Sequence, residues 1–529
     1  MAQPSAQPVG IEALIEAFSD PNAYPHPVPG GVELIQTHIS LVFLAGERVY
    51  KFKKPLDLGF LDYSTLEARR ACCEAEVSLN RRLAPSVYLQ VEAVTRGPDG
   101  ALRLGGEGEP LDYAVVMRRL PAERTFKALV AAGALTPDHM RQLAELLARF
   151  HRDAARDARI ASFGSFEVVA TNCRENFTQL APYVGATIHP SVLRRLEHLS
   201  EAELEAQRSR IAARVAAQIP CDSHGDLRLE HVYALDDALV VVDCIEFNER
   251  FRYGDPLADL AFPVMELDRA GRHDLARALV DAYFAASGDH GRALLELYVA
   301  YRAVVRGKIR SFMTSEDELP EQQRLAAVQR ARGHFLYALG VLGRPEQRPC
   351  LLLIGGLPAS GKSTLARGLE AHGFTWIRSD AVRKELAGLQ PEDSARDELD
   401  AGIYTAEWTQ RTYDACLERA REALFAGLRV VVDASFQRDA DRLRFFELAR
   451  AWGLRCGFLV CHVDAEATRA RLERRRAEGD ASDADWAVYQ QMAARWEPTS
   501  PRLTEVTVQI DTRGTPQAAV AQALAAVAG

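Results

Sequence analysis

The sequence predicts two domains: an α+β domain, followed by an α/β domain whose parallel sheet is covered by helices on both faces. Its 529 residues are too many for one ordinary core. Short runs of branched residues fill 32–120 and give way to amphipathic helices up to about residue 342. After a polar, proline-bearing segment at 343–349, apolar strands alternate with helices, which is typical of a parallel sheet. We therefore expect domains at 1–345 and 346–529.

Composition narrows the class of protein. Hydrophobic residues make up 48% and charged residues 26%, as in globular proteins. The net charge of -9 argues against general nucleic-acid binding. No apolar stretch approaches the ~20 residues that span a bilayer, and the N-terminus lacks the pattern of a signal peptide. The nine cysteines form no CxxC pair, which favours a reducing compartment. We expect a cytoplasmic protein.

The first domain is expected to have two lobes, mostly strands at about 30–120 and mostly helices at about 121–342. Residues 1–30, which are rich in proline after a short helix, are expected to pack loosely. Gly46 and Glu47 suit the turn of a hairpin. The predicted strands lie at 33–37, 41–45, 48–53, 87–95 and 113–118, and the predicted helices include 66–83 and 137–151.

Polar residues of this domain follow one another in the order that a kinase-like site requires. Such a site needs a strand lysine held by a helix glutamate, an aspartate that accepts the hydroxyl proton, and a second aspartate that holds Mg²⁺. Lys51 and Glu76 come first, then Asp226 of an HGD triplet, then Asp243 at the end of an apolar strand. Lys53 and Glu74 are the alternatives to Lys51 and Glu76; otherwise Lys53 and Lys54 are expected to be surface charges. A set of unrelated charges is the alternative to the whole site.

The strongest motif opens the second domain. The segment GLPASGKS at 356–363 fits GxxxxGK[ST], follows an apolar strand at 350–354 and precedes a helix at 364–371. In this motif backbone N–H groups wrap phosphates at a helix N-terminus, the lysine reaches the β- and γ-phosphates, and the serine holds Mg²⁺. We expect ATP and Mg²⁺ as cofactors, with a chance glycine-rich turn as the alternative. The expected nucleotide contacts are Gly356, Leu357, Pro358, Ala359, Ser360, Gly361, Lys362, Ser363 and Thr364.

Further strands of this domain are predicted at 375–379, 429–433, 456–463 and 506–510. Asp380, at the end of the first of these, can accept a proton from an acceptor hydroxyl, although it also suits a helix N-cap. Arg383 follows one turn later and can hold an anionic part of the substrate. Asp433 resembles a Walker B aspartate and suits the Mg²⁺ shell.

Two pairs of arginines lie on predicted helices of this domain. Arg471 and Arg475 are one turn apart and could both face the phosphates, where arginines stabilise the charge of a transferring phosphoryl group. Arg438 and Arg442 are also one turn apart and could bind an anionic part of the substrate. For both pairs the alternative is a solvated helix face.

At these residues, over about 349–529, the chain resembles the P-loop small-molecule and polynucleotide kinases, which include gluconate kinase-like, zeta-toxin-like and RNA/DNA 5′-hydroxyl kinase proteins. Over about 30–340 it looks like the aminoglycoside phosphotransferase and choline kinase-like family, through VYK at 49–51, HGD at 224–226 and DPLADLA at 255–261. That resemblance implies a bilobal protein-kinase-like fold in which Asp255 and Asp259 are structural. Together the two parts resemble bifunctional aminoglycoside phosphotransferase/ATP-binding proteins.

Two positions depart from the pattern of that family. The metal-binding asparagine five residues after Asp226 is His231 here, and imidazole is a poorer ligand for Mg²⁺ than an amide oxygen. His231 could accept Mn²⁺, act through water, or mark a weakened site. The loop at 37–40 contains no glycine, so Ser40 would have to make the phosphate contacts.

We therefore expect an ATP-dependent phosphotransferase that moves the γ-phosphate of ATP to a hydroxyl of a small molecule or nucleotide, with two ATP-binding modules. Two alternatives stay open. The first domain could be a nucleotide-sensing pseudokinase that regulates the second, or the second could be an RNA/DNA 5′-hydroxyl kinase.

Overall fold

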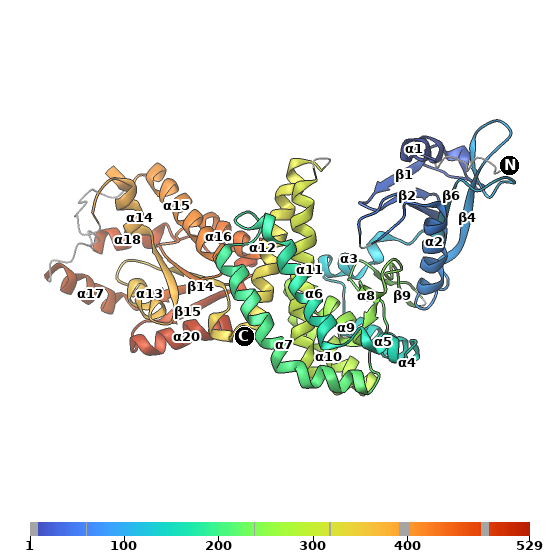
Figure 1. The fold of residues 1–529 in the computed structure, drawn as a ribbon. Coiled ribbons are helices and arrows are strands. Elements are labelled where there is room, and N and C mark those ends of the chain that lie inside the picture. The colour runs from blue at the N-terminus through green and yellow to red at the C-terminus, as the bar shows by residue number, and fades with distance from the viewer. Residues whose placement is uncertain are drawn as a thin grey trace. The chain divides into compact units, whose positions relative to one another are not determined.

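The structure, a computed structural model, describes residues 9–59, 61–236, 238–316, 319–390, 402–477 and 486–528 (Figure 1). Contacts between residues divide the chain into two units. The first consists of Met1–Val169 with Gln207–Val299, and the second of Ala170–Ala206 with Ala300–Gly529. The helix α12 (Glu321–Leu342), which ends just before the expected linker at 343–349, thus groups with the C-terminal sheet. A domain boundary near residue 345 stays a prediction.

The N-terminal part of the first unit is an antiparallel sheet with the order β1-β2-β3-β6-β4-β5. The turn between the second and third strands uses Gly46, whose φ of 58° is left-handed, where glycine is at ease. Five of these strands lie within one or two residues of those expected, while the short β5 was not predicted. Their bounds are β1 Val32–Gln36, β2 Ser40–Ala45, β3 Arg48–Lys53, β4 Tyr88–Arg96, β5 Leu102–Leu104 and β6 Asp112–Arg118.

Helix α1 (Ile11–Phe18) packs against this sheet, so the expectation that residues 1–30 pack loosely is wrong for the described part, residues 9–30. Leu14 and Phe18 are almost completely buried in one core with Phe43 and Phe52. The rings of Phe18 and Phe52 are stacked with centroids 5.0 Å apart. The helix packs tightly because its apolar face completes the core of the sheet, a tertiary contact that local composition does not reveal.

Helix α2 (Leu66–Asn80) packs on β6 and β4, with Cys73 and Val77 in a core that includes Val115. The Thr65 side chain accepts a hydrogen bond from the backbone N–H of Ala68 and caps the helix start. This packing buries the Glu76 side chain under the sheet.

The rest of the first unit is mainly helical, with α4 packed on α10 and Met140, Leu143 and Leu147 of α4 buried. Two short strand pairs, β7 with β10 and β8 with β9, frame the HGD segment. The bounds are α3 Phe126–Ala131, α4 Pro137–Asp153, α5 Ala158–Ser162, β7 Cys221–Asp222, β8 Val232–Ala234, β9 Leu239–Val241, α8 Glu249–Arg252, β10 Tyr253–Gly254, α9 Pro256–Arg269 and α10 His273–Ser287. Helices α6 (Phe166–Gln179), α7 (Pro190–Ala216) and α11 (Leu295–Phe312) contribute residues to both units.

The C-terminal sheet is parallel, with the order β12-β13-β11-β14-β15. Helices α13 and α20 pack together on one face, while α15 and α16 contact each other and the sheet on the other, as expected for the α/β class. The bounds are β11 Cys350–Gly355, α13 Lys362–Glu370, β12 Phe374–Arg378, α14 Ser379–Leu386, α15 Ala406–Phe425, β13 Arg429–Asp433, α16 Asp439–Ala451, β14 Arg455–His462, α17 Ala465–Ala477, α18 Trp486–Ala494, α19 Pro501–Thr504, β15 Thr507–Asp511 and α20 Pro516–Ala528.

Within the second unit, α7 and α12 contact the turn that follows α15. Ser191 Oγ donates to the carbonyl of Ala426, and Arg195 Nη1 donates to the carbonyl of Gly427, each at 2.8 Å. The guanidinium of Arg332 lies 4.2 Å from the centre of the Phe425 ring. The N-terminal part of α7 and one residue of α12 therefore contact the end of α15 and the turn that follows it.

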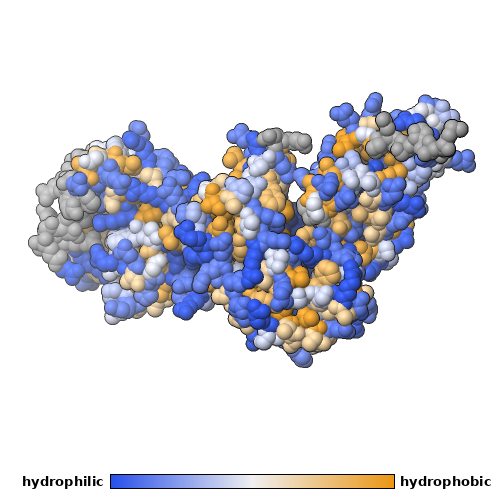
Figure 2. Space-filling model, viewed as in Figure 1, coloured by the Kyte–Doolittle hydropathy of each residue, from blue (hydrophilic) through white to orange (hydrophobic). Residues whose placement is uncertain are grey.

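Hydrophilic residues cover much of the face seen in Figure 2, with apolar residues in smaller patches between them. In the described part of the chain, every helix is too short or too polar to pass through a bilayer.

Candidate active sites

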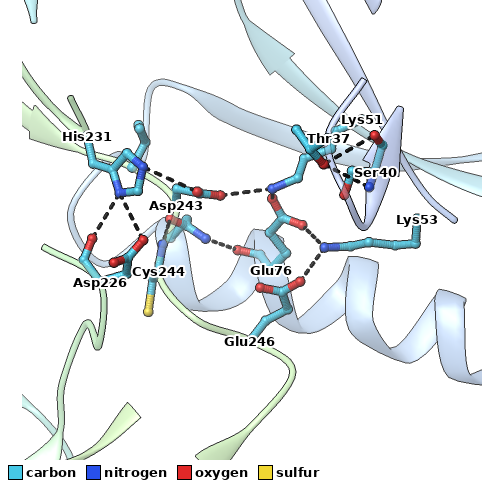
Figure 3. A network of polar contacts seen from close by, with 12 residues as sticks. Thr37, Ser40, Lys51, Lys53, Glu76, Asp226, His231, Asp243, Cys244 and Glu246 are labelled. Atoms are coloured by element: carbon cyan, nitrogen blue, oxygen red, sulfur yellow. Dashed lines mark hydrogen bonds and ion pairs between the residues drawn. The ribbon is translucent and has the colours of Figure 1, made fainter. Parts of the chain in front are cut away.

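Three of the residues expected in the first unit meet at one point (Figure 3). Lys51 Nζ, from β3, donates to Glu76 Oε1 of α2 and to Asp243 Oδ1, each at 2.9 Å. Burial disfavours the charged lysine, but the carboxylates of Asp243 and Glu76 outweigh burial and hold the pKa of Lys51 well above its usual value. Burial likewise raises the pKa of Asp243, and Lys51 lowers it by more, to well below its usual range. The three groups are ionised and mutually held.

Lys53 is not a surface charge, and that expectation is wrong. Its side chain is 1% exposed and forms ion pairs with both Glu76 and Glu246. The phenolic hydroxyl of Tyr63 donates to the same Glu246 carboxylate at 2.8 Å. Period-two alternation does place Lys53 on the face of Lys51, but Glu246 lies 193 positions away in the sequence, so no local pattern indicated its partner. Glu74, the alternative to Glu76, is exposed and pairs with Arg70.

The HGD segment is held by Asp259, the structural role that the family resemblance implied. Asp259 accepts hydrogen bonds from the backbone N–H groups of His224 and Gly225 at 2.7 and 2.8 Å, and its Oδ2 lies 3.2 Å from His151 Nε2. Gly225 has a φ of +86°, and a Cβ there would lie 2.7 Å from the Phe251 carbonyl oxygen. The sharp turn before Asp226 therefore requires glycine.

Asp226 lies beside two basic side chains. Its Oδ2 accepts from Arg228 Nε at 2.9 Å, and its backbone carbonyl oxygen is 2.9 Å from His231 Nδ1. On the other side of the imidazole ring, His231 Nε2 is 2.7 Å from Arg228 Nη2 and 3.4 Å from Asp243 Oδ2. Arg228 was not singled out by sequence reasoning; its position two residues after Asp226 was the available signal.

Asp226, His231 and Asp243 form a group that could hold a metal ion. One ligand atom from each lies within 4.8 Å of the others. Because the group consists of two carboxylates and one imidazole, it fits a divalent cation.

Ser40 is placed at the start of β2 with its side chain 1% exposed. Its backbone N–H already donates to Thr37 Oγ1 at 2.9 Å, so the expected backbone contact with a phosphate would have to replace that bond. Its Oγ is buried and has no hydrogen-bond partner among the described residues.

In the second unit the GLPASGKS loop lies between β11 and α13, as the motif requires. Gly356 and Gly361 have φ values of 144° and 92°. A Cβ at Gly356 would lie 2.6 Å from the Cys461 carbonyl oxygen and 2.7 Å from Ser360 Oγ, so only glycine fits. Lys362 Nζ donates to the carbonyls of Gly356 and Leu357, each at 2.9 Å, which curls the loop around the ammonium group.

Asp433 ends β13 beside Ile354 of β11. Burial raises the pKa of Asp433, against the charge of Lys362 and the hydroxyl of Ser363, which lower it. In the described part of the chain, Asp433 Oδ2 and Ser360 Oγ are both buried without a hydrogen-bond partner. An unsatisfied carboxylate oxygen beside the loop fits a cation as its missing partner, and an unsatisfied hydroxyl, which can donate, fits a phosphate.

The other residues expected at this site differ in placement. Asp380 lies in the first turn of α14, with Oδ2 at 3.5 Å from Arg378 Nη2 and 3.7 Å from Lys384 Nζ. The N-cap of that helix is Arg378, so the capping alternative for Asp380 is wrong. Arg383 Nη1 donates to the Ile403 carbonyl at 2.7 Å and lies 3.3 Å from Thr409 Oγ1.

Of the four helix arginines, Arg471 is the one that contacts the glycine loop, where an arginine facing the phosphates was expected. Its guanidinium donates to the carbonyls of Ala359, in the loop, and Thr512, after β15, at 3.2 and 2.6 Å. The side chain of Arg475 lies outside the described residues. Arg438 forms a double hydrogen bond with Asp441. Arg442 is fully buried and donates to three backbone carbonyls, so both alternatives considered for it, substrate binding and a solvated face, are wrong; its partners are Phe436, Gln437 and Glu497.

The chain is similar to known proteins over both parts. Residues 66–297 match the phosphotransferase enzyme family (APH), and residues 351–499 match an AAA domain family (AAA_33). Proteins of Mycobacterium tuberculosis and Mycobacterium bovis, each described only as an uncharacterized protein, are 33% identical over 505 residues, which is 94% of this chain and 96% of theirs. The chain belongs to the same family as these mycobacterial proteins. This member of the family joins a kinase-like APH domain to a P-loop kinase-like domain, which supports phosphotransferase activity.

Two solved structures are similar to parts of the chain. A choline/ethanolamine kinase family protein from Mesorhizobium loti is 14% identical, with a TM-score of 0.38, and covers 62% of this chain and 99% of its own. A gluconokinase from Sinorhizobium meliloti is 22% identical, with a TM-score of 0.26, and covers 34% and 92%. At these scores we draw no conclusion from either likeness.

Proposed function

We propose that the protein is an ATP-dependent kinase with two nucleotide sites, which moves the γ-phosphate of ATP to a hydroxyl of a small molecule or nucleotide. The observation that carries the proposal is the glycine loop at 356–363 between a buried strand and a helix. Beside it lies Asp433 Oδ2, which is buried without a hydrogen-bond partner among the described residues. A loop of this kind binds phosphates through backbone N–H groups and a lysine, and the aspartate adds the metal shell.

At the second unit, Lys362 would exchange its two carbonyl partners for the phosphates of ATP. Ser363 and Asp433 would hold Mg²⁺, which when bound neutralises phosphate charge. Asp380 is exposed enough to reach an acceptor, and we assign it the proton from the acceptor hydroxyl. Arg471 would brace the loop through the Ala359 carbonyl. Arg383 and Arg438 are already hydrogen-bonded within the unit, so each would have to change partners to hold a substrate anion.

At the first unit, the geometry supports a second site of the same chemistry. Lys51 is charged and oriented by Glu76, so its ammonium group can bind a nucleotide phosphate. Asp226 would accept the hydroxyl proton of the acceptor, and Asp243 with His231 would hold the metal ion. The ion pair between Arg228 and Asp226 is the specific observation that favours the alternative, a nucleotide-sensing pseudokinase, because it occupies the expected base.

The RNA/DNA 5′-hydroxyl kinase alternative receives less support. It predicts a basic groove at Arg383, Arg438 and Arg442, but Arg442 is buried and Arg438 is paired with Asp441.

Labelled γ-phosphate transfer from ATP tests the proposal, using the full chain and a panel of hydroxyl acceptors that includes 5′-hydroxyl oligonucleotides. The variants are Lys362→Ala, Asp226→Asn and the two combined. We expect each single variant to abolish transfer to a different acceptor and the double variant to transfer nothing. Loss of transfer only with Lys362→Ala would establish the pseudokinase alternative, and equal transfer by all variants would refute both sites.

A further inference from the structure

The partners of His231 fix which of its ring nitrogens carries a proton. Nδ1 is 2.9 Å from the carbonyl oxygen of Asp226, and a carbonyl oxygen can only accept, so Nδ1 carries the hydrogen. Nε2 is 2.7 Å from Arg228 Nη2, and a guanidinium group can only donate, so Nε2 presents a lone pair. The imidazole is therefore neutral, with a lone pair directed into the site.

That lone pair faces a second acceptor. Nε2 of His231 lies 3.4 Å from Asp243 Oδ2. Both atoms are acceptors in this tautomer, so they cannot form a hydrogen bond with each other. An Asp226 carboxylate oxygen completes a set of three ligand atoms within 4.8 Å of one another. His231 as a whole residue is 7% exposed, and its ring is oriented through Nδ1 by a backbone carbonyl, the usual way in which proteins orient a metal-binding histidine.

The chemistry of this set distinguishes among divalent metals. Mg²⁺ prefers oxygen ligands in an octahedral shell and loses its waters reluctantly, whereas imidazole suits first-row transition metals. We propose, building on the kinase function proposed above, that His231 makes the first unit selective for a transition-metal dication, represented by Mn²⁺, over Mg²⁺. The metal takes the place that Arg228 Nη2 holds at His231 Nε2.

Arg228 has a defined part in this exchange. Its guanidinium group contacts Asp226, Glu230 and His231 at once, and the carboxylates keep its pKa above the usual value despite burial. Because a guanidinium group and a metal ion cannot share one lone pair, metal binding must break the contact to His231. Arg228 thus competes with the free metal ion, and replacing its side chain by one without a charged donor should tighten metal binding.

Metal binding without nucleotide tests this proposal separately from catalysis. Every sample is the full chain carrying Asp433→Ala, which removes the carboxylate from the expected metal site of the second unit. Mn²⁺ is titrated and free Mn²⁺ is measured by electron paramagnetic resonance, in the absence and presence of Mg²⁺. Pulsed measurements on the bound ion then report coupling to an imidazole nitrogen.

We expect nitrogen coupling in the parent chain and its loss in His231→Asn, which replaces the imidazole nitrogen by an amide oxygen as the ligand. The preference for Mn²⁺ over Mg²⁺ should fall by about tenfold or more in that variant. Arg228→Met should bind Mn²⁺ several times more tightly, while Arg228→Lys, which retains the charge, should bind like the parent.

Bound Mn²⁺ without nitrogen coupling, no binding of Mn²⁺, or an unchanged metal preference in His231→Asn would each overturn the proposal. These outcomes can be told apart from failure of the kinase function, because phosphoryl transfer by the chain with Asp433 intact is measured separately. Nitrogen coupling without transfer would leave the metal site standing. If the parent and His231→Asn both transferred phosphate equally well with Mg²⁺ and with Mn²⁺, the proposed metal selectivity would be refuted and the kinase function would stand.

Discussion

Replacing Lys53 by methionine tests the arrangement of charges beneath the first nucleotide site. Lys53 lies between Glu76 and Glu246, and the exposed fractions of these three side chains are 1%, 1% and 5%. After the change Glu76 keeps Lys51, while Glu246 keeps only the hydroxyl of Tyr63. A buried carboxylate would thus lose its only cation among the described contacts.

The magnitude follows from that loss. Removing one partner of a buried ion pair costs about 3–5 kcal/mol. We expect the lower end, about 3 kcal/mol, because Glu76 retains Lys51 and Glu246 can take up a proton. At roughly 2–4 °C per kcal/mol for a domain of about this size, the unfolding transition of the first unit should fall by about 6–12 °C.

Scanning calorimetry of the full chain measures the shift. The double variant Lys53→Met/Glu246→Gln is the matched control, because it removes both partners and should recover part of the loss. Lys54→Met changes a neighbouring, partly exposed lysine and should leave the transition in place. If Lys53→Met shifts the transition no more than Lys54→Met, or if the double variant is less stable still, the assignment of Lys53 as the buried partner of Glu76 and Glu246 is refuted.

Three further changes test other parts of the structure. Lys362→Ala, made in a chain with Lys51→Ala, should weaken binding of a fluorescent ATP analogue by about 10- to 100-fold through loss of a charged donor, and unchanged affinity would contradict the loop assignment. Burial raises the pKa of Asp259, but hydrogen bonds from His151 and the HGD backbone lower it by more, to well below its usual range. The ionised Asp259 carboxylate therefore stabilises the fold fully above pH ~4, and this stabilisation is lost as the pH falls. The destabilisation by Asp259→Asn, measured by thermal unfolding, should therefore shrink on acidification; a difference independent of pH would show that the charge is unimportant. Gly427→Ala should destabilise the second unit by about 2 kcal/mol or more, because a φ of +76° is combined with a Cβ 2.9 Å from Val192 Cγ2. The control Gly373→Ala, at a φ of +82° in open space, should cost only about 1–2 kcal/mol. Equal losses of stability in urea unfolding would argue against the contact with Val192.

Features that depend on neighbours in sequence were predictable. Most strand bounds, the glycine loop and the order of Lys51, Glu76, Asp226 and Asp243 follow from local periodicity and motif spacing. The structure brings Lys51, Glu76 and Asp243 together. Local patterns carry this information because strands and phosphate loops are built from consecutive residues.

Features that depend on distant partners were not predictable. The burial of Lys53 depends on Glu246, and that of Arg442 depends on backbone carbonyls that include Glu497, 55 positions away. From the sequence alone, a charged residue is expected at the surface unless its buried partner is known. Likewise, the packing of α1 depends on contacts between its apolar face and strands that come later in the chain.

The path of the chain through the two units has a practical consequence. It passes from one unit to the other after Val169, Ala206 and Val299, so no single cut can release either unit as one continuous piece. A fragment starting at residue 346 would keep the glycine loop but lose Arg332 and Gln329, and with them the contact of Arg332 with Phe425 and the hydrogen bond of Gln329 with Trp452. Aggregation of such a fragment would reflect the missing helices rather than an error in the nucleotide site. Nicking the intact protein in an exposed loop and asking whether the pieces stay together is the better way to divide it.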